Sequence, residues 1–520
     1  MDDIHTKQAS ALKEVNHVFQ KLISEDPMES LHMVDIIQRL GIEHHFEEEI
    51  ETVLQKQQLI FSSHLHEITN NHKLDELALP FRLLRQRGYY VHPDVFDSLM
   101  KWNKRMFKEK YGEDVKGLIA LYEATQLSIE GEDSLDDAGY LSYQLLHTWL
   151  TRHKDHHETT CVANTLQHPL HYSLSRFRDK SMYLNDFMAR KEWTCLEDLS
   201  EINSCIIRLM NQNEVIQVYK WWKDLGMGKE LEFAEYQPIK WYMWPMACFT
   251  DPRFSDQRIE LTKPISLIYI IDDIFDVYGT LDQLTQFTDA VNRWELVGTE
   301  QLPDFMKICL NALYNVTNDF AMKIYEKHGL NPIETLKKSW VRLLNAFLEE
   351  AHWLNCTRLP TAEEYLNNGI MSTGVCVVLV HAFFLLDQSI NKETVAIMDD
   401  IPDIIYSVAK ILRLSDDLEG AKNKDGKGLD GSYLDCYMSE HQDVSAEEAQ
   451  RHVVHLISRE WKRLNREILT PNPLPSSFNN FCVNAARMVP LMYHYRSNPN
   501  ISNLKEHVQM LLLNIDAKRI

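Results

Sequence analysis

Glycine and proline are scarce in this chain. Its 520 residues contain 17 Gly and 17 Pro, although these residues usually make up about 7% and 5% of a protein. Because both interrupt helices, their scarcity favours a backbone that is mostly helical, with few strands. It also argues against a glycine-rich loop of the kind that holds nucleotide phosphates.

Positive charge and paired cysteines are also lacking. Lys and Arg total 54 against 76 Asp and Glu, which gives a formal net charge of −22. Nucleic acids and anionic membrane surfaces are bound by clusters of Lys and Arg, so we expect neither as a partner. The nine cysteines are dispersed, odd in number and without a Cys-x-x-Cys pair, which argues against a disulfide framework and is typical of a reducing compartment.

The N-terminal stretch MDDIHTKQASALKEVNHVFQ is acidic and amphipathic. It has neither the apolar core of a secretory signal nor the Arg-rich and Ser-rich, acid-poor composition of a transit peptide. We therefore expect a cytoplasmic protein, or a plastid protein whose transit peptide has been removed.

Helical periodicity begins early. The stretch from Leu31 to Gln57 predicts two amphipathic helices with a break near Gly41. Similar patterns predict an all-helical domain over residues 1–194. The periodicity weakens before residue 195 and then resumes, so we place a second helical domain at 195–520. The predicted fold class is all-α, with two helical domains.

The segment from Tyr365 to Leu386 has no formally charged side chain over 22 residues, which is long enough to span a membrane. However, it lacks basic flanks and carries several polar or flexible residues, namely Asn367, Asn368, Ser372, Thr373, Gly374 and His381. We interpret it as the buried centre of a helical domain rather than an integral membrane span. Such a helix can also line a hydrocarbon pocket.

Three aspartates lie close together in the apolar run IYIIDDIFDVYGT. Pro264 suits the first turn of a helix that ends at Gly279. In that helix Asp272 and Asp276 would share one face, while Asp273 would be rotated away. Two carboxylates at the C-terminal end of a helix call for cations, and their oxygen atoms suit Mg²⁺ or Mn²⁺. The alternative is a solvated acidic helix end.

A second acidic cluster ends the stretch KILRLSDDLEGAKNKDGKG. Arg413 and Asp416 are three residues apart, and Gly420 and Lys424 continue the same helical face. Arginine can donate paired hydrogen bonds to phosphate, and aspartate can bind a further cation. The alternative is an ordinary ion pair. Together the two clusters predict a diphosphate held by metal ions above an apolar pocket.

The sequence resembles the plant terpene synthases. DDIFD at 272–276 matches the family's aspartate-rich DDxxD motif, and the following stretch DVYGTLDQLTQFTDAVNRWE is similar to the family's sequence after that motif. The resemblance covers nearly the whole chain, with further similar stretches in ESLHMVDIIQRLGIEHHFEEEI, VYKWWKDLG, WYMWPM, DQRIELTKPIS and CYMSEH. The resemblance implies a vestigial N-terminal α-barrel domain and a C-terminal helical bundle of the class I isoprenoid synthase type, which holds the catalytic site.

The resemblance also implies roles for individual residues. Asp272 and Asp276 would bind Mg²⁺, Arg413 would hold the diphosphate, and Asp416 would begin a second metal motif. These four residues would bind the substrate and carry the catalysis.

Two aromatic residues fall where the family lines its pocket. Trp244 would offer a π face to a carbocation, and Tyr493 is a second candidate for the same wall. For Trp244 the alternative is an ordinary core position.

Two departures from the family pattern weaken the hold on diphosphate. The last position of the second metal motif is Lys424 rather than Glu, and a charged lysine cannot bind a metal, although the adjacent Asp425 could replace it. The family's arginine pair corresponds here to EYQ at 235–237, which leaves Lys240 as a partial substitute.

Within the family the chain is most similar to the branch that makes acyclic tertiary alcohols. It lacks the N-terminal tandem-arginine motif of cyclising monoterpene synthases. The stretch KWYMWPMACFTDP is similar to the sequences of the acyclic branch. We therefore expect a monomeric, Mg²⁺-dependent terpene synthase that ionises geranyl or farnesyl diphosphate. Water would then add to the allylic cation and give linalool or nerolidol.

Two alternatives stay open, and a third is disfavoured. The chain could be a degenerate family member that binds isoprenoid diphosphate with little turnover, and Lys424 and Glu235 are evidence for this. It could be a synthase with cyclic or olefin products. A chain-elongating prenyltransferase would need a second DDxxD motif, and the second cluster here is DDLEG.

Overall fold

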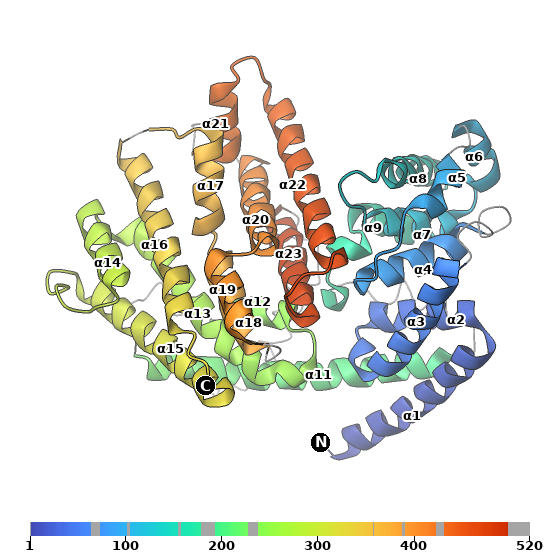
Figure 1. The fold of residues 1–520 in the computed structure, drawn as a ribbon, viewed down its shortest axis with the longest axis horizontal. Coiled ribbons are helices and arrows are strands. Elements are labelled where there is room, and N and C mark those ends of the chain that lie inside the picture. The colour runs from blue at the N-terminus through green and yellow to red at the C-terminus, as the bar shows by residue number, and fades with distance from the viewer. Residues whose placement is uncertain are drawn as a thin grey trace. The chain divides into compact units, whose positions relative to one another are not determined.

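The computed structural model describes residues 2–63, 73–100, 104–153, 158–177, 193–226, 238–356, 358–386, 390–422 and 431–497. All regular structure in these ranges is helical, which confirms the predicted all-α class (Figure 1). The α-helices are α1 (Asp2–Glu25), α2 (Pro27–Leu40), α3 (Glu47–Ser63), α4 (Leu74–Gln86), α5 (Asp94–Met100), α6 (Lys104–Tyr111), α7 (Val115–Thr125), α8 (Asp133–Arg152), α9 (Thr159–Gln167), α11 (Thr194–Asp224), α12 (Pro238–Cys248), α13 (Ser255–Asp273), α14 (Leu281–Arg293), α15 (Asp304–His328), α16 (Ile333–Cys356), α17 (Ala362–Ser372), α18 (Val375–Leu385), α19 (Lys392–Asp400), α20 (Asp403–Lys422), α21 (Tyr433–Glu440), α22 (Ala446–Leu469) and α23 (Ser476–Ser497). Short 3₁₀ turns occur at η1 (Glu43–His45), η2 (Leu170–Tyr172), η3 (Ser175–Phe177) and η7 (Pro252–Phe254), and a π-helical turn at η8 (Ile274–Tyr278).

The chain divides into two compact units. The first comprises Met1–Leu209 and Ile468–Pro471, and the second comprises Met210–Glu467 and Asn472–Ile520. This division falls inside helix α11, which begins at Thr194. The domain boundary predicted between residues 194 and 195 stays a prediction.

In the first unit, α2 and α3 form the helix pair predicted around Gly41. The Asp26 carboxylate caps α2 by accepting hydrogen bonds from the backbone N–H groups of Met28 and Glu29, at 3.1 and 3.0 Å. Gly41 ends α2 with a left-handed φ of 69°, which glycine adopts without steric cost. Both helix ends therefore follow from local sequence.

Helix α13 begins earlier than predicted. It starts at Ser255, so Pro264 lies inside the helix and not in its first turn, and that prediction is wrong. An interior proline costs about 3 kcal/mol in lost hydrogen bonding and steric clash, but Pro264 is buried in the core. The helix is also anchored by Arg258, whose Nε and Nη2 donate to the Glu214 carboxylate at 2.8 and 2.7 Å. Tertiary packing thus outweighs the local preference.

The aspartate-rich motif spans the end of α13. The α-helix stops at Asp273, and the π-turn η8 carries Asp276. The regular α-helical spacing predicted for Asp272 and Asp276 is therefore replaced by a wider turn, a feature frequent at functional sites. Gly279 follows as predicted; a Cβ atom there would overlap the Leu284 side chain.

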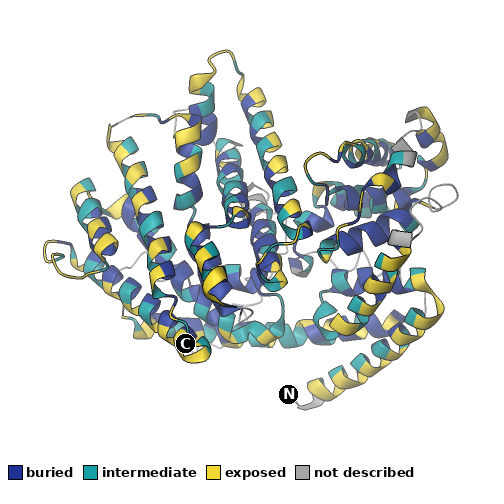
Figure 2. Ribbon diagram, in the orientation of Figure 1, coloured by how far each residue is buried: buried dark blue, intermediate teal, exposed yellow. Residues whose placement is uncertain are grey.

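The uncharged segment forms two helices, α17 and α18, which are separated by Gly374 with φ of 72°. By length and composition, the stretch Ala362–Leu385 could cross a membrane, but 78% of its most apolar window is buried inside the protein. This supports the prediction of a buried core segment. Figure 2 shows how buried residues line one side of the longer helices while exposed residues face outward.

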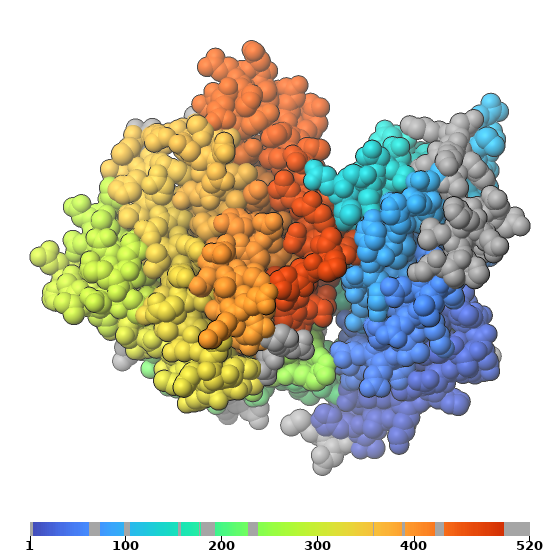
Figure 3. Space-filling view, viewed as in Figure 1, coloured from blue at the N-terminus to red at the C-terminus, as the bar shows by residue number. Residues whose placement is uncertain are grey.

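Helices of the second unit pack around a common centre. Helix α13 packs against α12 and α18, α16 packs against α17 and α18, and α20 packs against α17, α18 and α23. Helix α19 covers part of α16, and Figure 3 shows the two segments side by side. This arrangement leaves a cavity between the central helices.

Candidate active site

The cavity has a volume of about 750 Å³ and lies in the second unit. Volumes of this size are typical of small-molecule sites. Its apolar wall comes mainly from α13, α18 and α23, and includes Leu261, Ile265, Ile268, Val375, Val378, Leu379 and Phe481. Acidic and basic side chains complete the lining: Lys240, Asp272, Asp276, Glu350, Arg358, Arg413 and Asp416. The four residues predicted for metal and diphosphate are thus brought to one cavity.

The aspartates of the first motif repel one another. Burial raises the pKa of Asp272 to about 7, and the charges of Asp276, Glu350 and Asp273 add to the shift, while Arg413 opposes it. Burial also raises the pKa of Asp276, with Glu350 and Asp273 contributing. Such a concentration of negative charge is stabilised by a bound cation.

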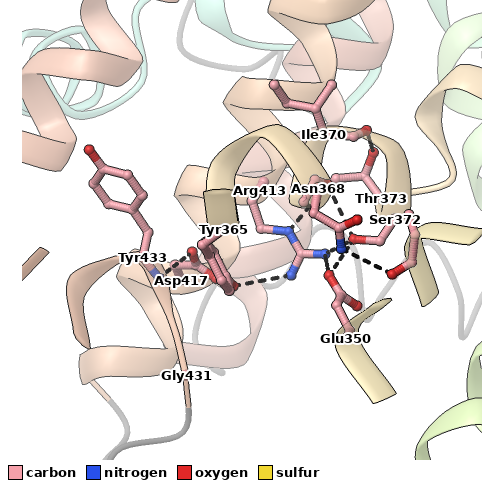
Figure 4. Close-up of polar contacts among 12 residues, drawn as sticks. Glu350, Tyr365, Asn368, Ile370, Ser372, Thr373, Arg413, Asp417, Gly431 and Tyr433 are labelled. Atoms are coloured by element: carbon pink, nitrogen blue, oxygen red, sulfur yellow. Dashed lines mark hydrogen bonds and ion pairs between the residues drawn. The ribbon is translucent and has the colours of Figure 1, made fainter. Parts of the chain in front are cut away.

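Arg413 on α20 is held by several partners from α16 and α17 (Figure 4). Its Nη2 donates to Ser372 Oγ at 2.7 Å and lies 3.5 Å from Glu350 Oε1. Its Nη1 donates to Tyr365 Oη, and its Nε to the carbonyl oxygen of Gly369, both at 3.4 Å. Ser372 Oγ in turn donates to Glu350 Oε1 at 2.6 Å. The guanidinium is therefore fixed in the cavity wall.

The second acidic cluster contributes a metal-ligand candidate and a structural residue. Asp416 lines the cavity. The buried Asp417 accepts hydrogen bonds from Tyr365 Oη at 2.9 Å and from the Tyr433 backbone N–H at 3.0 Å, which ties α20 to α17 and α21. Burial raises the pKa of Asp417 to about 6, although the positive charge of Arg413 opposes the shift. Lys424 and Asp425 lie outside the described residues.

Trp244 on α12 lines the cavity, where a π face can act on a substrate. Its Nε1 donates to Tyr269 Oη at 3.1 Å, and Lys240 Nζ lies 4.5 Å from the centre of the Tyr269 ring. The second aromatic candidate, Tyr493, is part of α23, but its side chain lies outside the described residues. The EYQ stretch at 235–237 also lies outside them.

Sequence reasoning missed the residues that surround Arg413. Glu350, Tyr365 and Ser372 belong to no charged motif, and only the three-dimensional packing brings them to α20. The one available signal was the uncharged segment that holds Tyr365 and Ser372, which was expected to line a pocket. Glu350 lies in an ordinary amphipathic helix and carries no such signal.

The donor atoms suit Mg²⁺. Mg²⁺ prefers oxygen ligands and commonly takes one or two carboxylates together with substrate phosphate oxygens. Within the described ranges, no three His, Cys, Asp or Glu side chains are arranged to hold a metal by themselves. The raised pKa of Asp272 means that its ionised form is destabilised in this cavity, and a bound cation would offset that. The site therefore fits a metal whose remaining ligands come from substrate and water.

Comparison with known proteins identifies the family. Residues 223–463 match the terpene synthase family, metal binding domain, and residues 2–170 match the terpene synthase, N-terminal domain. The chain is 76% identical to a Glycine max protein named neryl diphosphate diphosphatase, chloroplastic, over 99% of this chain and 97% of that protein. It is 43% identical to the chloroplastic S-(+)-linalool synthase of Arabidopsis thaliana, over 94% of this chain and 84% of that protein.

A solved structure agrees with these matches. Isoprene synthase from grey poplar leaves, in complex with three Mg²⁺ ions and dimethylallyl-S-thiolodiphosphate, superposes with a TM-score of 0.88 at 30% identity, over 98% of this chain and 97% of that one. The chain therefore belongs to the terpene synthase family, and it is an enzyme that acts on isoprenyl diphosphates.

Proposed function

We propose that this chain hydrolyses neryl diphosphate, a C10 isoprenyl diphosphate, to the acyclic alcohol nerol and free diphosphate. The observation that carries the proposal is the 76% identity to the Glycine max neryl diphosphate diphosphatase over almost the entire chain. The acid-rich cavity with its apolar wall supports it, because ionisation needs a held diphosphate beside a dry hydrocarbon pocket. Neryl diphosphate thus replaces geranyl and farnesyl diphosphate as the first choice of substrate.

The reaction is a substitution at the allylic carbon. The C1–O bond of the substrate breaks, and its electron pair leaves with the diphosphate. The oxygen of water adds to the allylic cation, and a proton of that water passes to the released diphosphate. Addition at C1 gives nerol, whereas addition at the tertiary carbon gives linalool.

The chain's own residues divide the work between the two ends of the substrate. Asp272, Asp276 and Asp416 would hold Mg²⁺, which when bound neutralises the leaving diphosphate and acts as a Lewis acid. Arg413, oriented by Ser372, donates to the phosphate oxygens. Trp244 and the apolar wall line the cavity, where they would hold the hydrocarbon and offer a π face to the cation.

A weak hold on the diphosphate supports an acyclic product. The cis double bond of a neryl chain brings its distant double bond within reach of the cation, so ring closure competes with water. Lys424 and the missing arginine pair both weaken retention of the leaving group. Rapid loss of diphosphate leaves room for water near C1, which favours the alcohol.

A second candidate is a linalool or nerolidol synthase that uses geranyl or farnesyl diphosphate. The 43% identity to the Arabidopsis thaliana linalool synthase favours it. Both of these relatives are named as chloroplastic, and we propose the plastid rather than the cytoplasm as the compartment.

The test is to incubate the purified chain with Mg²⁺ and, separately, neryl, geranyl and farnesyl diphosphate in H₂¹⁸O, and to analyse the volatiles by chiral gas chromatography and mass spectrometry. We expect ¹⁸O-labelled nerol from neryl diphosphate, and no product from the Asp276→Asn variant. Label in the diphosphate instead would mean P–O cleavage and would contradict ionisation. Linalool or nerolidol as the main product would establish the second candidate, and a folded protein without any turnover would indicate a binding-only family member.

A further inference from the structure

Arg358 lies in the connection between α16 and α17, on the rim of the cavity. Its backbone N–H donates to the carbonyl oxygen of Trp353 at 3.1 Å, which ties the connection to the end of α16. Trp353, Arg358 and the following residues Leu359 and Pro360 all line the cavity. The chain therefore presents this arginine to the same space as the acidic motifs.

Three basic side chains line the cavity in the part of the chain that the structure describes, and each is held differently. Arg413 is bound into the cavity wall, and Lys240 lies over the ring of Tyr269. Arg358 is 60% exposed and donates from Nη2 to the two carboxylate oxygens of Glu364, at 3.0 and 3.2 Å. Glu364 is itself 49% exposed.

An ion pair with this exposure adds little stability, because water screens it. Arg358 can therefore exchange the carboxylate for a more highly charged phosphate, to which a planar guanidinium donates paired hydrogen bonds. We propose that Arg358 binds the substrate diphosphate and that Glu364 is its partner in the substrate-free enzyme. The assignment rests on the proposed function. Arg358 would add one cation to a chain whose sequence lacks the family's arginine pair at 235–237.

Glu364 can release Arg358 without disturbing α17. Its carboxylate accepts a hydrogen bond from the Thr361 backbone N–H at 3.0 Å, and its own N–H donates to Thr361 Oγ1 at 3.1 Å. These bonds form the capping box that begins α17. The carboxylate thus has a structural role that does not depend on the arginine.

The test measures binding of inorganic diphosphate to the full chain in the presence of Mg²⁺ by isothermal titration calorimetry, which requires no turnover. We expect Arg358→Gln to weaken binding by about tenfold, the usual effect of losing one charge-assisted contact. Glu364→Gln keeps the capping box but removes the competing charge, so it should tighten binding severalfold. In the double variant Arg358→Gln/Glu364→Gln, that gain should disappear.

The control is Arg451→Gln on α22, which removes another exposed arginine that is paired with a glutamate, Glu448, at 3.9 Å. Arg451 is not among the described residues that line the cavity, so its variant should bind diphosphate as the parent does. Equal affinities for the parent and Arg358→Gln would overturn the proposal, as would equal losses in Arg358→Gln and Arg451→Gln. Loss of binding specific to Arg358→Gln would support it even if no variant turned over neryl diphosphate, an outcome that would reject only the proposed function.

Discussion

His381 is buried in α18 and has only part of its hydrogen-bonding capacity used. Its Nδ1 lies 2.7 Å from the carbonyl oxygen of Val377, and its ring packs edge-on against Phe320. Its Nε2 is buried and has no hydrogen-bond partner among the described residues. Burial lowers the pKa of His381 to about 4, so the folded protein holds this ring neutral.

This burial makes stability depend on pH. The pKa of His381 in the folded state is below the unfolded value of 6.5. The free energy of unfolding is therefore highest above pH 6.5 and decreases as the pH falls towards 4, because the unfolded state then binds the proton more readily. At pH 5 the loss is about 2 kcal/mol. We expect His381→Phe, which packs similarly and does not titrate, to recover that amount at pH 5 relative to its effect at pH 7.5.

The measurement is urea unfolding of the parent and His381→Phe between pH 4.5 and 7.5. His455→Gln, which changes an exposed histidine, serves as the control. A stability difference between the parent and His381→Phe that stays constant over this pH range would show that His381 does not titrate as described.

Some residues of the candidate site could be selected from the sequence, and others could not. Asp272, Asp276, Arg413 and Asp416 could be selected from the sequence because their charges are conspicuous at the ends of apolar stretches, and all four line the cavity. Glu350 could not be selected in this way. It reaches Arg413 only through the packing of α16 against the neighbouring helices.

Helices α17 and α20 approach closely at Gly369. A Cβ atom on this residue would lie 2.9 Å from Nε and 3.1 Å from Cγ of Arg413. Alanine favours a helix over glycine by up to about 1 kcal/mol, which offsets the cost of displacing Arg413, so Gly369→Ala should leave the melting temperature close to that of the parent. The methyl group should nevertheless displace Arg413 from Ser372 and lower kcat/KM for the diphosphate substrate by roughly tenfold or more.

The check is steady-state kinetics of Gly369→Ala together with thermal unfolding. Asn367→Ala, at an exposed position of the same helix, is the matched control and should leave kcat/KM unchanged. If Gly369→Ala had the kcat/KM of the parent, the exact place of Arg413 would not matter for turnover.

Element boundaries followed from the sequence only where local chemistry decides them. Asp26 and Gly41 begin and end α2 as their side-chain chemistry and backbone freedom require. The helix start predicted at Pro264 was wrong, because the preference of proline for a first helical turn is weaker than the packing that extends α13 back to Ser255. The π-turn at Ile274–Tyr278 has no signature in sequence periodicity.

At the scale of the molecule, the described lining of the cavity lies wholly in the second unit. The first unit has a buried charge cluster of its own. Asp35 accepts two hydrogen bonds from Arg39 Nε, at 2.9 and 3.0 Å, and one from Arg82. Burial alone would raise the pKa of Asp35, but the two arginines outweigh it and hold the pKa at about 2.

Asp35→Asn should therefore destabilise the first unit without changing the chemistry of the second. It removes the counter-charge of two buried arginines, which costs about 3–5 kcal/mol. In differential scanning calorimetry we expect the first unit to unfold at a lower temperature than in the parent. The KM measured at low temperature should equal that of the parent.

Glu109→Gln is the control, because it breaks an exposed pair with Arg105 and should change stability by less than about 0.5 kcal/mol. A KM that rises in Asp35→Asn, with the protein still folded at the assay temperature, would show that the first unit acts on the active site.

The sequence by itself determined that this protein is helical and which residues are candidate metal and diphosphate ligands. Helical periodicity, scarce glycine and proline, and acidic motifs are properties of residues near one another in the chain. Only the tertiary structure decided the partners of those ligands. Ser372 is 41 positions from Arg413, and Tyr365 is 52 positions from Asp417. Such pairs form through the burial of whole helix faces, which no local pattern records.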